Sequence, residues 1–156
     1  MSDCSRTDLE ESLCRSIVVM KVESSARCNT LSGVEWLIEA YGCSSQSLQS
    51  RESLQSLFDT IIDELELKPL GIPLWHQFPV SLGITGIWLL QESHLALHSF
   101  PEHHSLCLNL FCCKPRPELN WSQHLARLVN AKEVHVHQHI RAYARAASET
   151  QPVALC

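Results

Sequence analysis

Three short apolar runs follow one another between residues 84 and 111, with only a few residues between them. The last of these runs alternates leucine with other residues, which is the pattern of a strand buried on one side. Connections this short join antiparallel strands, because parallel neighbours need a crossover of a dozen residues or more. The runs 84–91, 94–100 and 105–111 are therefore predicted to form an antiparallel meander.

An amphipathic helix is predicted before the meander. Six apolar side chains recur at spacings of three and four, which places them on one side of a helix: Leu54, Leu57, Phe58, Ile61, Ile62 and Leu65. Ser47 is a candidate cap at the start of this helix, and Pro69 ends it. The segment 69–79 contains three prolines and is predicted to be loop or irregular edge structure.

The remaining elements complete a fold class. A strand is predicted at 34–41, a short helix at 122–130 and a last strand at 133–140. The order of strand, helix, meander, helix and strand predicts an α+β fold. We expect a two-layer sandwich in which one antiparallel sheet carries two helices on one face.

The chain is expected to hold one domain, at 33–144. Its 156 residues suit a single domain, and 45% apolar against 19% charged residues is typical of a globular protein. Residues 1–32 are predicted to be a polar extension, partly disordered, with one short element around 17–22. Residues 145–156 are predicted to be a tail.

Charge and hydropathy argue against several partners. The 12 basic and 17 acidic residues give a net charge of −5, which does not favour binding to nucleic acid or to anionic membranes. The longest uninterrupted apolar run, 87–90, is far shorter than a membrane-spanning helix. The N-terminus lacks the basic start and apolar stretch of a signal peptide, so we expect a cytoplasmic protein whose eight cysteines are thiols.

The nine histidines and eight cysteines raise two possible kinds of site. His135, His137 and His139 alternate along the last predicted strand, but the chain lacks the paired Cys or His knuckles of structural zinc sites. We interpret these histidines as the solvated side of the strand and predict no metal site, with a metal-binding module as a minor alternative. A nucleophilic pair of Cys113 or Cys107 with a histidine is also open, although a chain so rich in both residues offers such pairs by chance.

A more specific motif lies inside the meander. Glu92-Ser93-His94 is followed by His98, Phe100 and the pair Pro101-Glu102. This ordered set resembles the bacterial and archaeal S-adenosylmethionine decarboxylases, which are pyruvoyl enzymes made as proenzymes. The first strand, ending in the segment 39–43, and the triplet 76–78 also resemble the family pattern. The resemblance covers about residues 33–144.

The resemblance implies a self-processing reaction and a cofactor made from the chain itself. Ser93 would attack the carbonyl of Glu92, with Thr85 where the family has a serine. His98 would then remove the α-proton of Ser93, so that residue 93 becomes a pyruvoyl group at the start of a new chain. That group would form a Schiff base with the substrate amine and accept electrons as CO2 leaves.

The resemblance also implies roles for residues that contact the substrate. Cys113 lies 20 residues after Ser93, as the family's catalytic cysteine does, and would return a proton to the substrate. Glu102 would bind the substrate ribose and Phe78 would stack on the adenine. The family pattern further implies a homo-oligomer of processed protomers that supplies the aminopropyl donor for spermidine synthesis.

Three departures from the family pattern indicate a divergent member. Thr85 adds a methyl group, the usual Thr-Cys-Gly becomes Cys112-Cys113-Lys114, and the first-strand histidine is replaced near Glu35. Cys112 is therefore a rival for the role of Cys113. The efficiency of processing and activation by a diamine are left open. Two alternatives to the main function stand: decarboxylation of arginine or ornithine on the same scaffold, and an unprocessed paralogue that acts as a partner or regulator.

Overall fold

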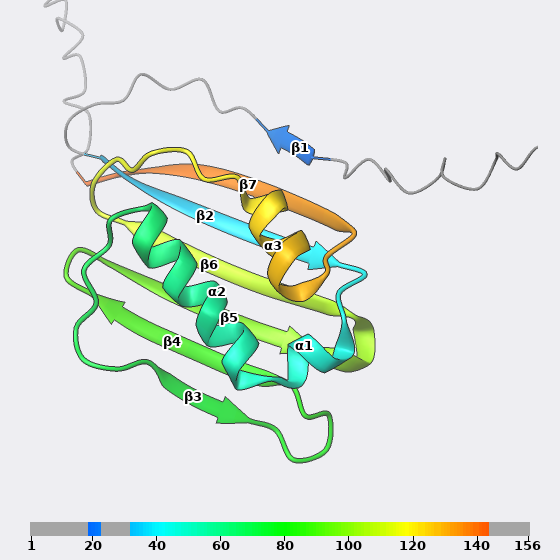
Figure 1. The fold of residues 1–156 in the computed structure, drawn as a ribbon. Helices are drawn as coiled ribbons and strands as arrows, with labels where there is room; N and C mark the ends of the chain where they lie inside the picture. Colours follow the sequence, from blue (N-terminus) through cyan, green and yellow to red (C-terminus); the bar gives the residue numbers. More distant parts are fainter. Residues whose placement is uncertain (1–18, 23–31, 144–156) are drawn as a thin grey trace, which may run out of the picture.

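The computed structural model describes residues 19–22 and 32–143 (Figure 1). The strands are β1 (Val19–Val22), β2 (Ser32–Tyr41), β3 (Leu74–Gln77), β4 (Ile84–Leu90), β5 (Ser93–Phe100), β6 (Ser105–Cys112) and β7 (Glu133–Ala142). The α-helices are α1 (Ser45–Gln49), α2 (Arg51–Glu64) and α3 (Trp121–Val129), and a 3₁₀ turn η1 (Pro101–His103) joins β5 to β6. No described helix is long and apolar enough to cross a membrane.

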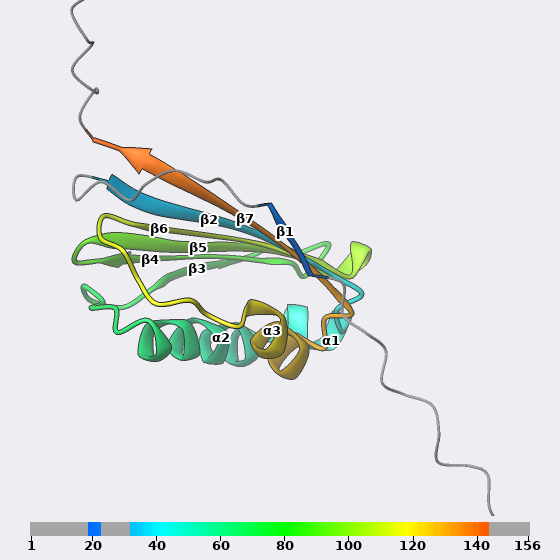
Figure 2. The same cartoon turned by 90° about the horizontal axis from the view of Figure 1, so that it is seen from above.

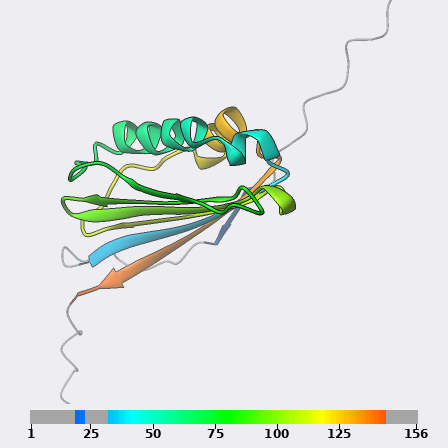
Figure 3. The ribbon, with the colours of Figure 1, turned by 90° about the horizontal axis from the view of Figure 1, so that it is seen from below.

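The strands form one sheet in the order β1-β7-β2-β6-β5-β4-β3. The predicted meander is confirmed, because β4, β5 and β6 are antiparallel neighbours. All other pairs are antiparallel except β1 with β7, which is parallel. The three helices lie on one face of the sheet, and no described helix covers the other, which we call the open face (Figures 2 and 3). The predicted α+β sandwich is therefore correct.

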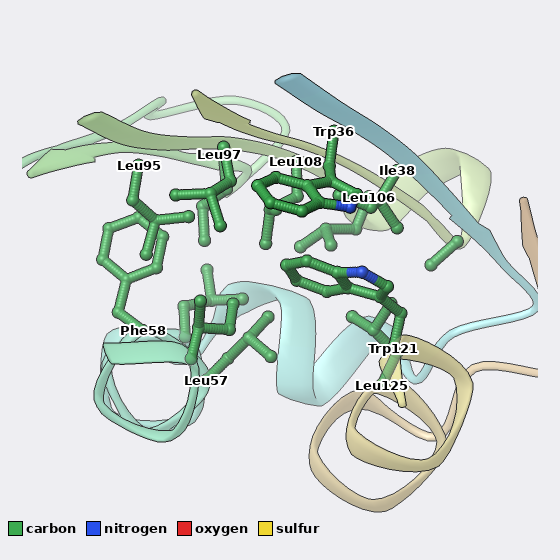
Figure 4. Packing of buried hydrophobic residues seen from close by; sticks show 14 of the residues in the cluster. Trp36, Ile38, Leu57, Phe58, Leu95, Leu97, Leu106, Leu108, Trp121 and Leu125 are labelled. Atoms are coloured by element: carbon green, nitrogen blue, oxygen red, sulfur yellow. The ribbon is translucent and has the colours of Figure 1, made fainter. Parts of the chain in front are cut away.

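The core lies between the sheet and the helices. Leu97 of β5 and Leu106 of β6 point from the sheet towards the helices, and Leu57 and Phe58 of α2 meet them (Figure 4). These four side chains are fully buried. Cutting one such leucine back to alanine typically costs about 2–5 kcal/mol, so this layer anchors the strands that carry the candidate site.

The helical region contains two helices where the sequence predicts one. The side chain of Ser50 accepts a hydrogen bond from the N–H of Ser53 at 3.1 Å and begins α2, and Ser50 also ends α1. The prediction of Ser47 as a cap is wrong. Ser47 lies inside α1, and its N–H donates to the side chain of the true cap, Ser44. Closely spaced serines offer several caps, and the apolar pattern does not choose among them.

A short edge strand, β3, lies within the segment predicted to be loop or irregular edge structure. Pro73 and Pro79 stand outside β3, so all of its residues keep an N–H for pairing with β4. Trp75 of β3 packs on Phe58, with 4.9 Å between ring centroids. A Cβ at Gly86 would lie 2.2 Å from the Trp75 ring, so this close contact requires glycine.

The N-terminal segment is described in part. β1 falls inside the predicted extension 1–32, near the short element expected around 17–22, and it pairs with β7. The rest of the extension up to residue 31, and the predicted tail 145–156, lie outside the described residues.

Candidate active site

The turn between β4 and β5 places Glu92 directly before Ser93. Leu90 and Ser93 are paired across the strands, so only two residues, Gln91 and Glu92, make the turn. The carbonyl oxygen of Glu92 accepts a hydrogen bond from the N–H of Cys113 at 2.9 Å. The carbonyl of Cys113 in turn accepts a hydrogen bond from the Tyr143 hydroxyl at 2.7 Å. The predicted cleavage site is therefore held by the main chain that follows β6.

Basic side chains surround the carboxylate of Glu92. Its Oε1 lies 2.5 Å from Nζ of Lys114, and its Oε2 lies 3.6 Å from Nη2 of Arg116. The hydrogen bond from Lys114 lowers the pKa of Glu92 below its ordinary value, and the charges of Arg116 and Lys68 act in the same direction. These groups and Ser93 line a pocket of about 280 Å³.

The two neighbouring cysteines differ in their surroundings. Cys112 is paired with Ser93 across the strands and is fully buried, whereas Cys113 is exposed. Burial raises the pKa of the Cys112 thiol, and contacts with Arg116 and with the Ser93 hydroxyl oppose that shift. The side chain next to Ser93 is thus that of Cys112, while the main chain of Cys113 holds Glu92.

The other predicted site residues gather at the far end of the same hairpin. Thr85 of β4 is paired with His98 of β5, and the Thr85 hydroxyl lies 2.9 Å from Nδ1 of His98. Both residues line a pocket of about 230 Å³ together with Phe78, Phe100 and Glu102. Phe78 is 46% exposed, so its ring is available to a ligand. Four residues predicted from the sequence, Phe78, Thr85, His98 and Glu102, are therefore neighbours.

The two groups are separated along β5. Side chains two residues apart on a strand point to the same face. Ser93 therefore shares the helix-covered face with the buried residues Leu95 and Leu97. The side chain of His98 points to the other side of the strand and is exposed on the open face. Five residues of strand span about 16 Å, and the structure does not bring Ser93 and His98 of one chain together.

A polar network on the open face reaches the residue after Ser93. His94 Nε2 lies 3.1 Å from Oδ1 of Asn109, and the Asn109 amide donates to Oε1 of Glu35 at 3.0 Å. Glu35 also forms an ion pair with Arg141. The hydrogen bond from Asn109 is the main cause that lowers the pKa of Glu35 below its ordinary value, and burial opposes it. The network crosses four neighbouring strands and fixes the orientation of His94.

The histidines of β7 form no metal cluster. His135 lies 2.6 Å from the carboxylate of Glu133, and His137 lies 3.9 Å from that of Glu39. Among the described residues, no group of three or more His, Cys, Asp or Glu side chains is arranged to hold a metal ion. The three histidines lie along one face of β7, as the alternation predicts.

Sequence reasoning missed some residues near Glu92. Arg116 and Lys68 contribute positive charge beside Ser93, and neither belongs to the motif that identified the site. Arg116 could have been suggested by its place in the sequence, because two basic residues, at 114 and 116, follow shortly after a predicted strand. No sequence pattern points to Lys68. It lies near Glu92 because its main-chain carbonyl accepts a hydrogen bond from the N–H of Gln91.

Comparison with known proteins places the chain in a family. The family model described as S-adenosylmethionine decarboxylase matches residues 34–142. The S-adenosylmethionine decarboxylase proenzyme of Archaeoglobus fulgidus is 32% identical over 77 residues, which cover 49% of this chain and 67% of that protein. The proenzyme of Picrophilus torridus is 30% identical over 84 residues, covering 54% of this chain and 63% of that protein.

A third relative matches over a longer segment. The S-adenosylmethionine decarboxylase proenzyme of Shouchella clausii is 29% identical over 96 residues, which cover 60% of this chain and 71% of that protein. The segment matched by the family model includes both groups of site residues and more than half of the chain. This chain therefore belongs to the S-adenosylmethionine decarboxylase family.

Proposed function

We propose that this protein is a self-processing, pyruvoyl-dependent decarboxylase that acts on S-adenosylmethionine and so supplies the aminopropyl donor for spermidine synthesis. The relatives are named as proenzymes of this activity. The observation that carries the proposal is the hydrogen bond from the Cys113 N–H to the carbonyl oxygen of Glu92, directly before Ser93. The residues fit the cofactor, because Ser93 itself supplies the atoms of the pyruvoyl group.

The first step of cleavage uses groups of the turn. The Ser93 hydroxyl attacks the carbonyl carbon of Glu92, and negative charge develops on the carbonyl oxygen. The N–H of Cys113 already donates to that oxygen, which is the arrangement of an oxyanion hole. The C–N bond then breaks, the amine takes a proton, and an ester joins Glu92 to the Ser93 side chain.

The second step needs a base. His98 removes the α-proton of Ser93, and the ester C–O bond breaks to release the carboxylate of Glu92. Water then replaces the nitrogen of residue 93, ammonia leaves, and a pyruvoyl group begins the new chain 93–156. In the tautomer in which Nδ1–H of His98 donates to the Thr85 oxygen, Nε2 is the atom that can take the proton. Once formed, the pyruvoyl group provides the carbonyl that binds the substrate amine and accepts electrons as CO2 leaves.

A second copy of the chain would bring a His98 close to Ser93. His98 lies about 16 Å from Ser93 along the strand and on the opposite face, which supports a base that comes from another protomer. Large apolar side chains stand exposed on the open face: Leu74 is 70% exposed, Leu89 62% and Ile87 45%. Burial of such a patch favours association. We infer a homo-oligomer in which His98 of one protomer serves Ser93 of its partner.

The pocket around His98 supports a nucleoside substrate. The exposed ring of Phe78 offers a stacking surface for adenine, and the carboxylate of Glu102 can accept hydrogen bonds from ribose hydroxyls. Cys113 would return the proton to the substrate, with Cys112 as the alternative thiol. We place the enzyme in the cytoplasm, where these cysteines would stay reduced.

Intact-mass analysis tests this function. Purified protein should contain two pieces, 1–92 and 93–156, and the second should begin with a pyruvoyl group. Ser93→Ala should stay a single chain, whereas the matched control Ser56→Ala, on the exposed side of α2, should be cut normally. A wild-type chain that stays intact at 17.6 kDa after prolonged incubation would instead indicate an unprocessed paralogue.

Release of labelled CO2 then tests the substrate. Processed protein should release CO2 from carboxyl-labelled S-adenosylmethionine faster than from arginine or ornithine. Faster release from either amino acid would contradict the proposed substrate and leave the self-processing reaction standing.

A further inference from the structure

Two adjacent positions after β6 hold the same residue of the turn. The N–H of Cys113 donates to the main-chain oxygen of Glu92 at 2.9 Å, and the side chain of Lys114 binds the carboxylate of Glu92 at 2.5 Å. Arg116 approaches the second carboxylate oxygen at 3.6 Å. Glu92 is therefore attached by its main chain and by its side chain to one short segment.

These contacts hold the residue whose carbonyl belongs to the peptide bond that cleavage would break. Glu92 is the last residue before Ser93, and the turn that holds it has only two residues. The carbonyl of a partly exposed turn residue can rotate away from a single hydrogen bond, because one such bond contributes little net stability by itself. A second contact from the next residue along limits that rotation.

We propose that Lys114, assisted by Arg116, is a positioning residue for chain cleavage. By holding the Glu92 carboxylate, it keeps the Glu92 carbonyl oxygen on the Cys113 N–H and the carbonyl carbon open to the Ser93 hydroxyl. This inference rests on the proposed self-processing function. It also gives a role to Lys114, which stands where the family pattern has glycine.

The charges of the turn agree with this role. The hydrogen bond from Lys114 and the charges of Lys114 and Arg116 lower the pKa of Glu92 below its ordinary value, which extends the ionised range of its carboxylate to lower pH. Because the folded pKa is lowered, the ion pair is present above the ordinary carboxyl pKa and is lost only as pH falls through the folded value. The Lys114 side chain is 64% exposed, so the contact is screened by salt and its effect is modest.

Cleavage rates of matched variants test the proposal. Wild type, Lys114→Met, Lys114→Arg and Arg116→Met would be made by cell-free synthesis, and the fraction cut would be followed by intact mass. We expect Lys114→Met to be cut about two- to fivefold more slowly, and Lys114→Arg to be cut at close to the wild-type rate. The control Lys132→Met changes an exposed lysine of the loop before β7 and should have no effect.

Salt provides a second comparison. About 1 M salt shortens the screening length to about 3 Å, so it should slow wild-type cleavage towards the rate of Lys114→Met and leave that variant nearly unchanged. Equal rates for wild type and Lys114→Met would overturn the positioning role, and because both would still be cut, the proposed function would stand. A wild-type chain that is never cut would contradict the proposed function itself.

A measurement without any cleavage completes the test. In the Ser93→Ala background, NMR titration of the Glu92 carboxyl should show a lower pKa with Lys114 than with Lys114→Met. An unchanged pKa would mean that the ion pair does not form in solution, and the proposal would fall whatever the cleavage rates.

Discussion

The two ends of the β4–β5 hairpin hold their functional groups in different ways. At the turn, Glu92 is fixed by a main-chain N–H and by basic side chains, all from the same chain. At the other end, His98 shares one side-chain hydrogen bond with Thr85, and it stands exposed on the open face beside its pocket. The turn end is complete in one protomer, whereas the His98 end has no reaction partner there. The difference indicates that each end can be inactivated by its own substitution, and that a variant defective at one end can complement a variant defective at the other.

Complementation between two inactive variants gives the largest expected effect. Ser93→Ala and His98→Ala should each stay uncut when made alone. When the two are made together, Ser93 of the His98→Ala chain can meet His98 of the Ser93→Ala chain, so fragments should appear from the His98→Ala chain only. Mass spectrometry with a size tag on one chain identifies the source of each fragment.

The control for complementation removes both groups from one copy. His98→Ala made together with the double variant Ser93→Ala/His98→Ala should give no fragments, because Ser93 is still present but neither chain then carries His98. If the two single variants fail to complement while wild type is cut, each chain must bring its own Ser93 and His98 together, and the comparison drawn from the hairpin is wrong.

Alkylation of the two neighbouring cysteines probes how rigid the turn end is. Cys113 is exposed, whereas Cys112 is fully buried and burial raises the pKa of its thiol, so little reactive thiolate forms. In the folded Ser93→Ala variant at pH 8, iodoacetamide should modify Cys112 at least about 100-fold more slowly than Cys113. Peptide mass spectrometry measures both rates, and in urea the two should be similar. Similar rates in the folded protein would show that the turn end opens readily.

Thr85 tests the single contact at the other end. Thr85→Val keeps the shape and removes the hydroxyl that holds Nδ1 of His98, so cleavage should slow about five- to tenfold. Thr85→Ser keeps the hydroxyl and should be cut at close to the wild-type rate, as intact mass over time would show. An undiminished rate for Thr85→Val would mean that the protomer interface, not Thr85, orients the histidine.

Much of the fold follows from local patterns in the sequence. The alternation in β6 and the short turns around β5 identify the meander, and the apolar stripe of α2 identifies the face that covers it. The sequence does not separate β3 from irregular edge structure, because the prolines on either side of it suggest a loop and its pairing depends on Trp75 fitting over Gly86. The cap at Ser44 was missed because several serines there have the same local propensity.

The sequence proposes candidates for the site residue by residue but does not give their arrangement. Order and spacing select Ser93, His98 and Cys113 as candidates, yet the same spacing places Ser93 and His98 on opposite faces of one strand. That consequence is visible only once β5 is known to run from Ser93 to Phe100 without a break and to pair with β6 along its whole length. The basic residues around Glu92 depend on the path of the segment after β6, which no local pattern specifies.

The strand order has a consequence for a chain that is cut after Glu92. The piece 1–92 contributes β1, β2, β3 and β4, the piece 93–156 contributes β5, β6 and β7, and strands of the two pieces are interleaved in the sheet. Four of the six strand interfaces then join different pieces, so the pieces cannot separate without unfolding. Folding of the uncut chain is unimolecular, whereas reassembly after denaturation of the cut form is bimolecular and depends on concentration. Cleavage would thus make recovery of the folded protein depend on the meeting of two polypeptides.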